Sequence, residues 1–125
     1  MNSTEHFTDV IAWQKAYKIA VAIYRATEKF PQSEIYGLTS QVRRAAVSVA
    51  SNIAEGFGRT SVKEKTQFYS VARGSLMELQ NQLLIAKGIG YLNNKTYNQL
   101  ELLCIEAVKV LSGLQKANNT KGKRV

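Results

Sequence analysis

Residues 38–59 read LTSQVRRAAVSVASNIAEGFGR, and this stretch decides the fold. Its many alanines and serines leave little side-chain bulk on most sides of a helix, so neighbouring helices can approach it closely. Its apolar residues recur at the 3–4 spacing of one helical face, at Leu38, Val42, Ala45, Val49 and Ile53. The pattern predicts a central helix over residues 38–55, and Gly56 is the expected stop.

Three further segments carry helical periodicity, over residues 9–30, 62–87 and 94–116. Thr8 or Asp9 is the expected N-cap of the first, and Pro31 ends it. Ser61 and Glu64 have the spacing of a capping box that opens the third helix. The connections are short, so consecutive helices are expected to run antiparallel, as an all-α up-down-up-down four-helix bundle over residues 9–117. Residues 1–8 are expected to be a flexible N-terminus and residues 118–125 a disordered basic tail.

Each of the other helices has an apolar stripe that is expected to face the core. In the first helix it runs through Trp13, Tyr17, Ala20, Tyr24 and Thr27. In the third it runs through Phe68, Ala72, Ser75, Leu79, Leu83 and Ala86. In the fourth it runs through Tyr97, Leu100, Cys104, Ala107, Leu111 and Leu114.

The composition is that of a folded domain, with 125 residues, 45% of them hydrophobic, and one proline. Cys104 is the one cysteine, which excludes a disulfide framework, and its place on an apolar stripe predicts burial. The polar N-terminus is unlike a signal peptide, and no apolar run approaches the roughly 20 residues of a membrane span. A soluble cytoplasmic protein is the expectation.

The residue types needed for common catalytic sites are scarce. His6 is the only histidine, which excludes a Ser-His-Asp triad, a two-histidine zinc site and the Glu-x-x-His pairs of di-iron bundles. The stretch GFGR at 56–59 could cradle a phosphate, but a turn between helices explains it better. We expect no enzyme activity, no metal and no cofactor.

Positive charge is concentrated in the second half of the chain. The net charge of +8 divides into +1 over residues 1–58 and +7 over residues 59–125. Lys116, Lys121, Lys123 and Arg124 have no acidic neighbour. Such a balance suggests a polyanion partner, with nucleic acid first and an anionic membrane second, and a charged surface that only maintains solubility explains it equally well. The candidate nucleic-acid-binding residues are Arg59, Lys63, Lys65, Arg73, Lys121, Lys123 and Arg124.

Two other groups of residues are expected to have specific partners. Charges among small and apolar neighbours on the second and third helices are candidates for ion pairs between helices: Arg43, Arg44, Glu55 and Glu78. Apolar residues outside the core-facing arcs are candidates for a subunit interface: Met77, Leu84, Leu102 and Ile105. They predict a homo-oligomer.

The chain resembles the intervening-sequence proteins encoded within insertions of bacterial 23S ribosomal RNA genes. The resemblance rests on FTDVIAWQKAY at 7–17, on residues 30–59 and on residues 68–92. Its strongest signatures are SQ-x-RRAA at 40–46, SNIAEG at 51–56 and ARGS-x-x-EL at 72–79. The resemblance implies a four-helix bundle that assembles into a ring, with a pentamer favoured. It also implies a relation to the accessory proteins of diversity-generating retroelements, which bind nucleic acid and a reverse transcriptase.

These observations favour a non-catalytic, oligomeric protein that binds RNA or DNA through its phosphate backbone with weak sequence specificity. No aromatic-rich platform for single strands and no base-reading helix is evident. The alternative is a structural or adaptor oligomer that binds another protein through its exposed apolar residues. The sequence leaves the gene context and the cognate partner open.

Overall fold

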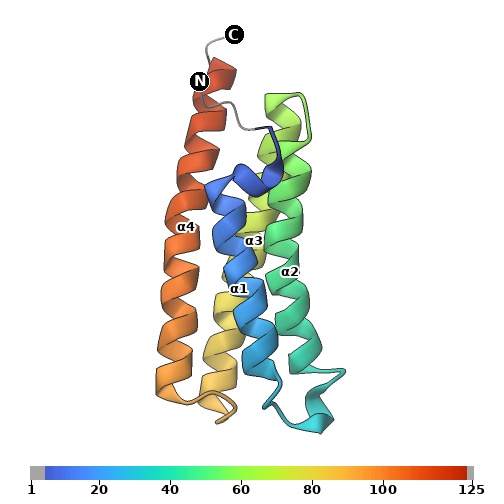
Figure 1. Ribbon diagram of the computed structural model, residues 1–125, viewed down its shortest axis with the longest axis vertical. Helices are drawn as coiled ribbons and strands as arrows, with labels where there is room; N and C mark the ends of the chain where they lie inside the picture. Colours follow the sequence, from blue (N-terminus) through green and yellow to red (C-terminus); the bar gives the residue numbers. More distant parts are fainter. Residues whose placement is uncertain (1–4, 124–125) are drawn as a thin grey trace.

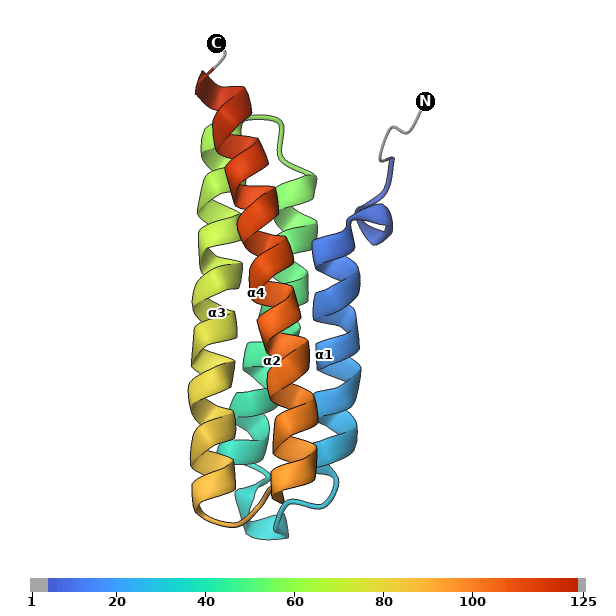
Figure 2. The same ribbon diagram turned by 90° about the vertical axis from the view of Figure 1, so that its left-hand side faces the viewer.

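The computed structural model describes residues 5–123, and the side chains of residues 5–121. Its elements are η1 (Phe7–Asp9), α1 (Ile11–Thr27), η2 (Gln32–Glu34), α2 (Leu38–Phe57), α3 (Val62–Gly88) and α4 (Asn94–Lys123), and no strand occurs in this range. Consecutive helices run antiparallel (Figures 1 and 2). Around the bundle, α1 packs against α2 and α4, and α3 packs against the same two. The predicted four-helix bundle is confirmed.

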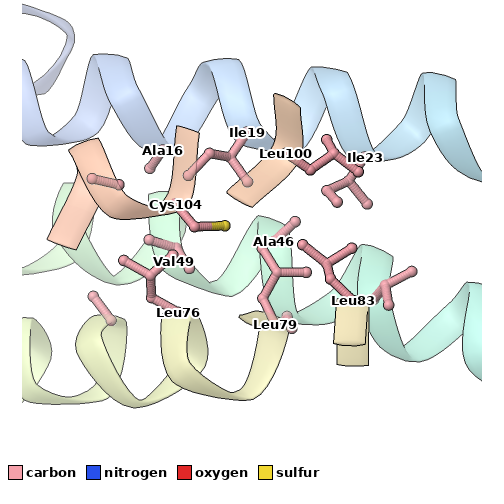
Figure 3. Close-up of a cluster of buried hydrophobic side chains, with 14 of the residues drawn as sticks. Ala16, Ile19, Ile23, Ala46, Val49, Leu76, Leu79, Leu83, Leu100 and Cys104 are labelled. Carbon is pink, nitrogen blue, oxygen red and sulfur yellow. The ribbon is translucent and has the colours of Figure 1, made fainter. Parts of the chain in front are cut away.

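The core is a column of aliphatic side chains that all four helices supply. Figure 3 shows Ile19, Val49, Leu79 and Cys104 turned toward one another from α1, α2, α3 and α4. The small residues of α2 allow close packing of the neighbouring helices, as predicted, because Ala45 and Ala46 are buried. Burying one leucine or isoleucine side chain contributes roughly 1.5–3 kcal/mol to the stability of the folded state. This column therefore supplies most of the favourable free energy of folding.

The core-facing stripe of α1 differs from the predicted one. The buried residues are Ala12, Ala16, Ile19, Ile23 and Thr27. Tyr17 and Tyr24 are instead about half exposed, at 53% and 45%. The aliphatic stripe fits between closely packed helices, whereas a tyrosine at the seam buries its ring edge and keeps its hydroxyl in water.

The core-facing stripe of α3 is confirmed at Ala72, Leu79, Leu83 and Ala86, which are buried, and differs from the prediction at two positions. Tyr69 and Leu76 are buried, while the neighbouring Phe68 and Ser75 are only partly so. In α4 the predicted stripe is correct, with Leu114 at its half-buried edge.

Gly56 is the last residue but one of α2, so the helix stop falls two residues after the predicted one. The helix continues to Phe57, and Gly58 is the C-cap, with a right-handed backbone. Gly56 is buried because the ring of Tyr69 packs directly on it. A Cβ at this position would lie 2.6 Å from Tyr69 Cε1, so the glycine is required for close packing of α2 on α3.

Cys104 lies at the centre of the bundle with no exposed surface. Burial, with a smaller contribution from the charge of Glu101, raises the pKa of its thiol to about 12. At pH 8 the reactive thiolate is therefore only roughly one part in 10⁴.

We expect Cys104 to be inert to a thiol reagent in the native protein and to react fully after denaturation. Following the release of the chromophore from a disulfide reagent at pH 8, with and without urea, tests this. Stoichiometric reaction within seconds in the native state would contradict the burial.

The N-terminal end of α1 is organised differently from the prediction. Val10 is its N-cap and makes no side-chain cap, so neither Thr8 nor Asp9 has that role. Asp9 instead accepts a hydrogen bond from the backbone N–H of His6 at 3.3 Å, and His6 Nδ1 accepts one from the N–H of Thr8. These contacts form η1, so residues 5–8 have defined structure, and residues 1–4 lie outside the described part.

The last helix continues to Lys123, past its predicted end at residue 116. The reason is Asn118, which is buried against the start of α3. Its Nδ2 donates to the carbonyl oxygen of Val62 at 3.3 Å and to Thr66 Oγ1 at 3.1 Å. Predicting a disordered tail was therefore wrong for residues 118–123, and residues 124–125 lie outside the described part.

At the opposite end of the bundle, Glu34 links the connection between α1 and α2 to the connection between α3 and α4. Its carboxylate accepts the backbone N–H of Leu38 at 3.0 Å and the hydroxyl of Tyr91 at 2.8 Å. These two hydrogen bonds, that of Leu38 first, lower the pKa of Glu34. A carboxyl with a lowered pKa contributes stability that is lost as the pH falls through that pKa, so acid is expected to weaken the contacts of Glu34 at this end of the bundle.

Candidate nucleic-acid interface

One end of the bundle gathers basic residues from three helices. Arg59 follows α2, Lys63 and Lys65 lie in the first turn of α3, and Lys116 and Lys121 lie near the end of α4. Figures 1 and 2 show the end of α4 beside the turn that joins α2 to α3. We call these five residues the basic end. The long α4, held by Asn118, brings its last lysines to the start of α3.

Lys63, Lys116 and Lys121 are the cations of the basic end that are available to a ligand. All three are exposed, and none has an ion pair within the described side chains. The acidic residues nearby are Asp9, Glu55 and Glu64, of which Glu55 is paired with Arg59. Lys116 is a site residue that the prediction omitted, although its lack of an acidic neighbour was already visible in the sequence.

Lys65 has mainly a structural role. Its Nζ donates to the carbonyl oxygens of Gly56 at 3.0 Å and Phe57 at 2.9 Å, which are among the last carbonyls of α2. A cation at a helix C-terminus satisfies these acceptors and complements the helix dipole. Partial burial lowers the pKa of Lys65, and the charge of Lys121 lowers it further.

Arg59 is partly engaged. Its Nη2 lies 3.1 Å from Glu55 Oε2, four residues earlier, and its guanidinium lies 4.7 Å from the centre of the Phe68 ring. Both side chains of the ion pair remain about half exposed, so the pair contributes at most a few tenths of a kcal/mol. A phosphate could therefore compete for this arginine.

Arg73 is not part of the basic end, which corrects its predicted role. It is half-buried two turns further along α3, and its Nη1 donates to Ser112 Oγ and to Gln115 Oε1 of α4. It fixes the register of α3 against α4. Arg124 lies outside the described residues, as does the side chain of Lys123.

The predicted ion pairs between α2 and α3 are not formed among the described side chains. The two salt bridges there are Glu55 with Arg59, and Lys15 with Glu106 at 3.9 Å. Arg43 donates instead to Thr27 Oγ1 at 2.9 Å. Arg44 and Glu78 are exposed. Between α2 and α3, a hydrogen bond between uncharged side chains stands where ion pairs were expected, because the hydroxyl oxygens of Ser48 and Ser75 lie 2.8 Å apart.

The four candidate interface residues are all exposed. Met77 and Leu84 of α3 are 63% and 55% exposed, and Leu102 and Ile105 of α4 are 62% and 39% exposed. A hydrogen bond from Gln80 to Glu101 fixes the register of α3 against α4. Met77 lies one turn before Gln80 in α3, and Ile105 lies one turn after Glu101 in α4. These two side chains therefore lie near each other across the seam of α3 and α4. We call the four residues the aliphatic face.

A cleft of about 650 Å³ opens beside the basic end, and no prediction anticipated it. Val10, Leu114 and Tyr69 contribute to its walls, and Lys65 and Lys121 contribute charge. Its lining comes from all four helices, so no local pattern in the sequence could show it. Within residues 5–121 no cluster of three potential metal ligands occurs. No helix in the described range has the length and apolar character that crossing a bilayer requires.

Comparison with known proteins decides the family. The family model described as 23S rRNA-intervening sequence protein matches residues 8–113. The chain belongs to this family. No curated protein is significantly similar to it.

The chain is also similar to a solved structure. This is the crystal structure of a protein with unknown function from the S23 ribosomal protein family of Bacteroides thetaiotaomicron VPI-5482, with 19% sequence identity and a TM-score of 0.78. The match covers 84% of this chain and 98% of that chain. At this level of identity it shows a shared fold.

Proposed function

We propose that this protein binds RNA without catalysis, through phosphate contacts at the basic end. The observation that carries the proposal is the convergence of Lys63, Lys116 and Lys121. Lys63 is more than 50 residues from Lys116 and Lys121 in the sequence, and all three are exposed and have no carboxylate partner among the described side chains. Phosphate contacts of this kind supply affinity but carry no sequence information, so weak sequence specificity is expected.

The family description supports RNA as the nucleic acid, because it refers to intervening sequences of 23S rRNA. The proposal assigns no catalytic residue. His6 is engaged in capping η1, and Cys104 is buried with a raised pKa.

We propose further that the aliphatic face joins subunits of a homo-oligomer, in the ring of five that the family resemblance implies. Four large apolar side chains exposed on two adjacent helices are the kind of surface that a subunit interface covers. Five copies with a formal charge of +8 each would carry roughly +40, so a few phosphate contacts per subunit would add up over one RNA.

Charge reversal tests the proposed contacts. The triple variant Lys63→Glu, Lys116→Glu and Lys121→Glu is expected to lower the affinity for a structured RNA at least about tenfold. It is also expected to reduce the slope of log K against log salt by about 3, because three phosphate contacts are lost. Fluorescence anisotropy with a labelled RNA hairpin, measured at several salt concentrations, gives both quantities.

The matched control carries the same change of net charge at the other end of the bundle, with Arg25→Glu, Lys29→Glu and Lys95→Glu. These residues are also exposed. The control is expected to keep the wild-type slope and most of the affinity. Equal losses in both variants would show a response to net charge alone. If neither the wild type nor the control bound RNA, the adaptor function through the aliphatic face would be favoured instead.

A further inference from the structure

A row of aromatic side chains runs along the outer side of α1. Phe7 and Trp13 have ring centres 5.2 Å apart in an edge-to-face arrangement, and Trp13 and Tyr17 are stacked at 5.3 Å. Tyr24 continues the row two turns further along the helix, about 10 Å from Tyr17 at 1.5 Å per residue. We call Phe7, Trp13, Tyr17 and Tyr24 the aromatic ladder. This row was not predicted, because Trp13, Tyr17 and Tyr24 are assigned to the core by the sequence pattern and Phe7 to a flexible N-terminus.

The ladder is held in place yet accessible. Gln14 Nε2 donates to the carbonyl oxygen of Thr8 at 2.9 Å, which fastens η1 and therefore Phe7 to α1. Trp13 is partly buried against the core, whereas Tyr17 and Tyr24 are about half exposed. Rings fixed in this way offer stacking surfaces with little loss of side-chain entropy on binding.

An arginine lies at each end of the ladder. At one end the guanidinium of Arg43 lies 4.6 Å from the centre of the Tyr24 ring, anchored by its hydrogen bond to Thr27. At the other end a shallow hollow of about 590 Å³ lies between Phe7 and the end of α2, and it is lined by Arg59 and by its ion-pair partner Glu55. Arg59 thus belongs both to this hollow and to the basic end. Aromatic rings beside cations are how proteins bind unpaired nucleotides, with stacking for the base and charge for the phosphate.

The position of the ladder separates it from the proposed subunit interface. The ladder lies on the side of α1 next to α2, since Tyr24 lies against Arg43 and Phe7 borders the end of α2, whereas the aliphatic face lies on α3 and α4. The aliphatic face has no aromatic ring and suits a second copy of the chain. The ladder has polar tips and neighbouring arginines, which suit a polar, negatively charged ligand with flat apolar surfaces.

We propose that the aromatic ladder binds a single-stranded segment of RNA, whose bases stack on Trp13, Tyr17 and Tyr24 and whose phosphates contact Arg43 and Arg59. The inference rests on the RNA-binding function proposed above. It adds a ligand class, since paired bases inside a duplex are not available for stacking. An RNA with a single-stranded stretch beside a helix would contact the ladder and the basic end together.

Trp13 is the only tryptophan, so its fluorescence reports on the ladder alone. Oligouridylate of about 12 nucleotides is expected to quench this fluorescence on binding. An abasic ribose-phosphate oligomer of equal length and charge is expected to bind at least about fivefold more weakly and without quenching, because stacking of one base is worth roughly 1–3 kcal/mol. Binding of the oligouridylate without quenching, or equal affinity for both oligomers, would overturn the proposal.

Variants distinguish the ladder from the basic end. Tyr17→Ser with Tyr24→Ser is expected to weaken oligouridylate binding about tenfold or more and to leave binding of a blunt RNA hairpin unchanged. Replacing both tyrosines by phenylalanine should preserve binding, because the rings remain. Tyr36→Ser is the matched control, since Tyr36 is 95% exposed and lies outside the ladder. Circular dichroism verifies that each variant is folded.

The failures of the two proposals differ. If the hairpin binds but the serine variant keeps full affinity for oligouridylate, the ladder proposal alone fails. If neither RNA binds, the RNA-binding function fails and the ladder proposal fails with it. If the serine variant dissociates the oligomer, as light scattering would show, the ladder is a subunit interface and the proposal is overturned.

Discussion

Replacing Gly56 by alanine is expected to lower the free energy of unfolding by about 1–3 kcal/mol, the range of overpacked cores. The added Cβ would lie 2.6 Å from Tyr69 Cε1 and 3.1 Å from the Cβ of Phe68, so α2 and α3 would have to separate. Urea denaturation at a fixed protein concentration measures the change, since association could otherwise alter the apparent stability.

Gly113→Ala is the control for this prediction. Gly113 also lies inside a helix, but a Cβ there meets nothing within 4 Å. Alanine is the better helix former, so this variant is expected to gain about 0.5–1 kcal/mol. If alanine stabilised the protein at both positions, the close packing of Gly56 on Tyr69 would be refuted.

The second large effect is expected from Leu76→Ala. Leu76 has no exposed surface and lies in the central column of the core (Figure 3). Removing most of its side chain leaves a cavity, and such changes cost about 2–5 kcal/mol. Thermal and urea unfolding followed by circular dichroism would show the loss as a lower Tm and a lower denaturation midpoint.

Val71→Ala provides the comparison on the same helix, because Val71 is 52% exposed and lies outside the aliphatic face. Its effect is expected to stay within about 0.5 kcal/mol, as for most surface changes. A loss at Leu76 no larger than that at Val71 would mean that the core column is not packed as described.

The fold could be predicted because helical periodicity is a local property. The stripe of α2 from Leu38 to Ile53 and the half of the Ser61–Glu64 capping box in which Ser61 accepts the N–H of Glu64 follow from residues three or four apart. The stripe of α1 was misjudged because aromatic and aliphatic residues alternate around that helix, and size decided which set entered the core. Gly56 was misjudged because its need for space comes from Tyr69, thirteen residues away.

The candidate site could be predicted only in outline. The excess of positive charge in the second half identified Lys63 and Lys121, but a side chain's partners are a property of the packed bundle. Arg73 donates a hydrogen bond to Ser112, and Lys65 donates to the last carbonyls of α2. No local sequence pattern predicts these contacts. The cleft and the extension of α4 likewise depend on contacts between segments distant in sequence.

The basic end and the aromatic ladder meet at Arg59, which contacts Phe68 on one side and borders the hollow beside Phe7 on the other. This geometry links the two proposals, because an RNA bound at the basic end could continue along α1 without leaving the protein surface. A structured RNA with a single-stranded flank is therefore the best ligand for testing the central claim, which is electrostatic binding of RNA by an oligomer.

The most direct test is chromatography coupled to light scattering, with the purified protein and such an RNA at about 50 mM and about 200 mM salt. The account predicts an oligomer that elutes together with RNA at the lower salt. Three phosphate contacts alone imply a loss of affinity of roughly 20- to 40-fold at the higher salt, and contacts from several subunits to one RNA imply a larger loss. An oligomer that carries no RNA at either salt, or binding that is independent of salt, would contradict it.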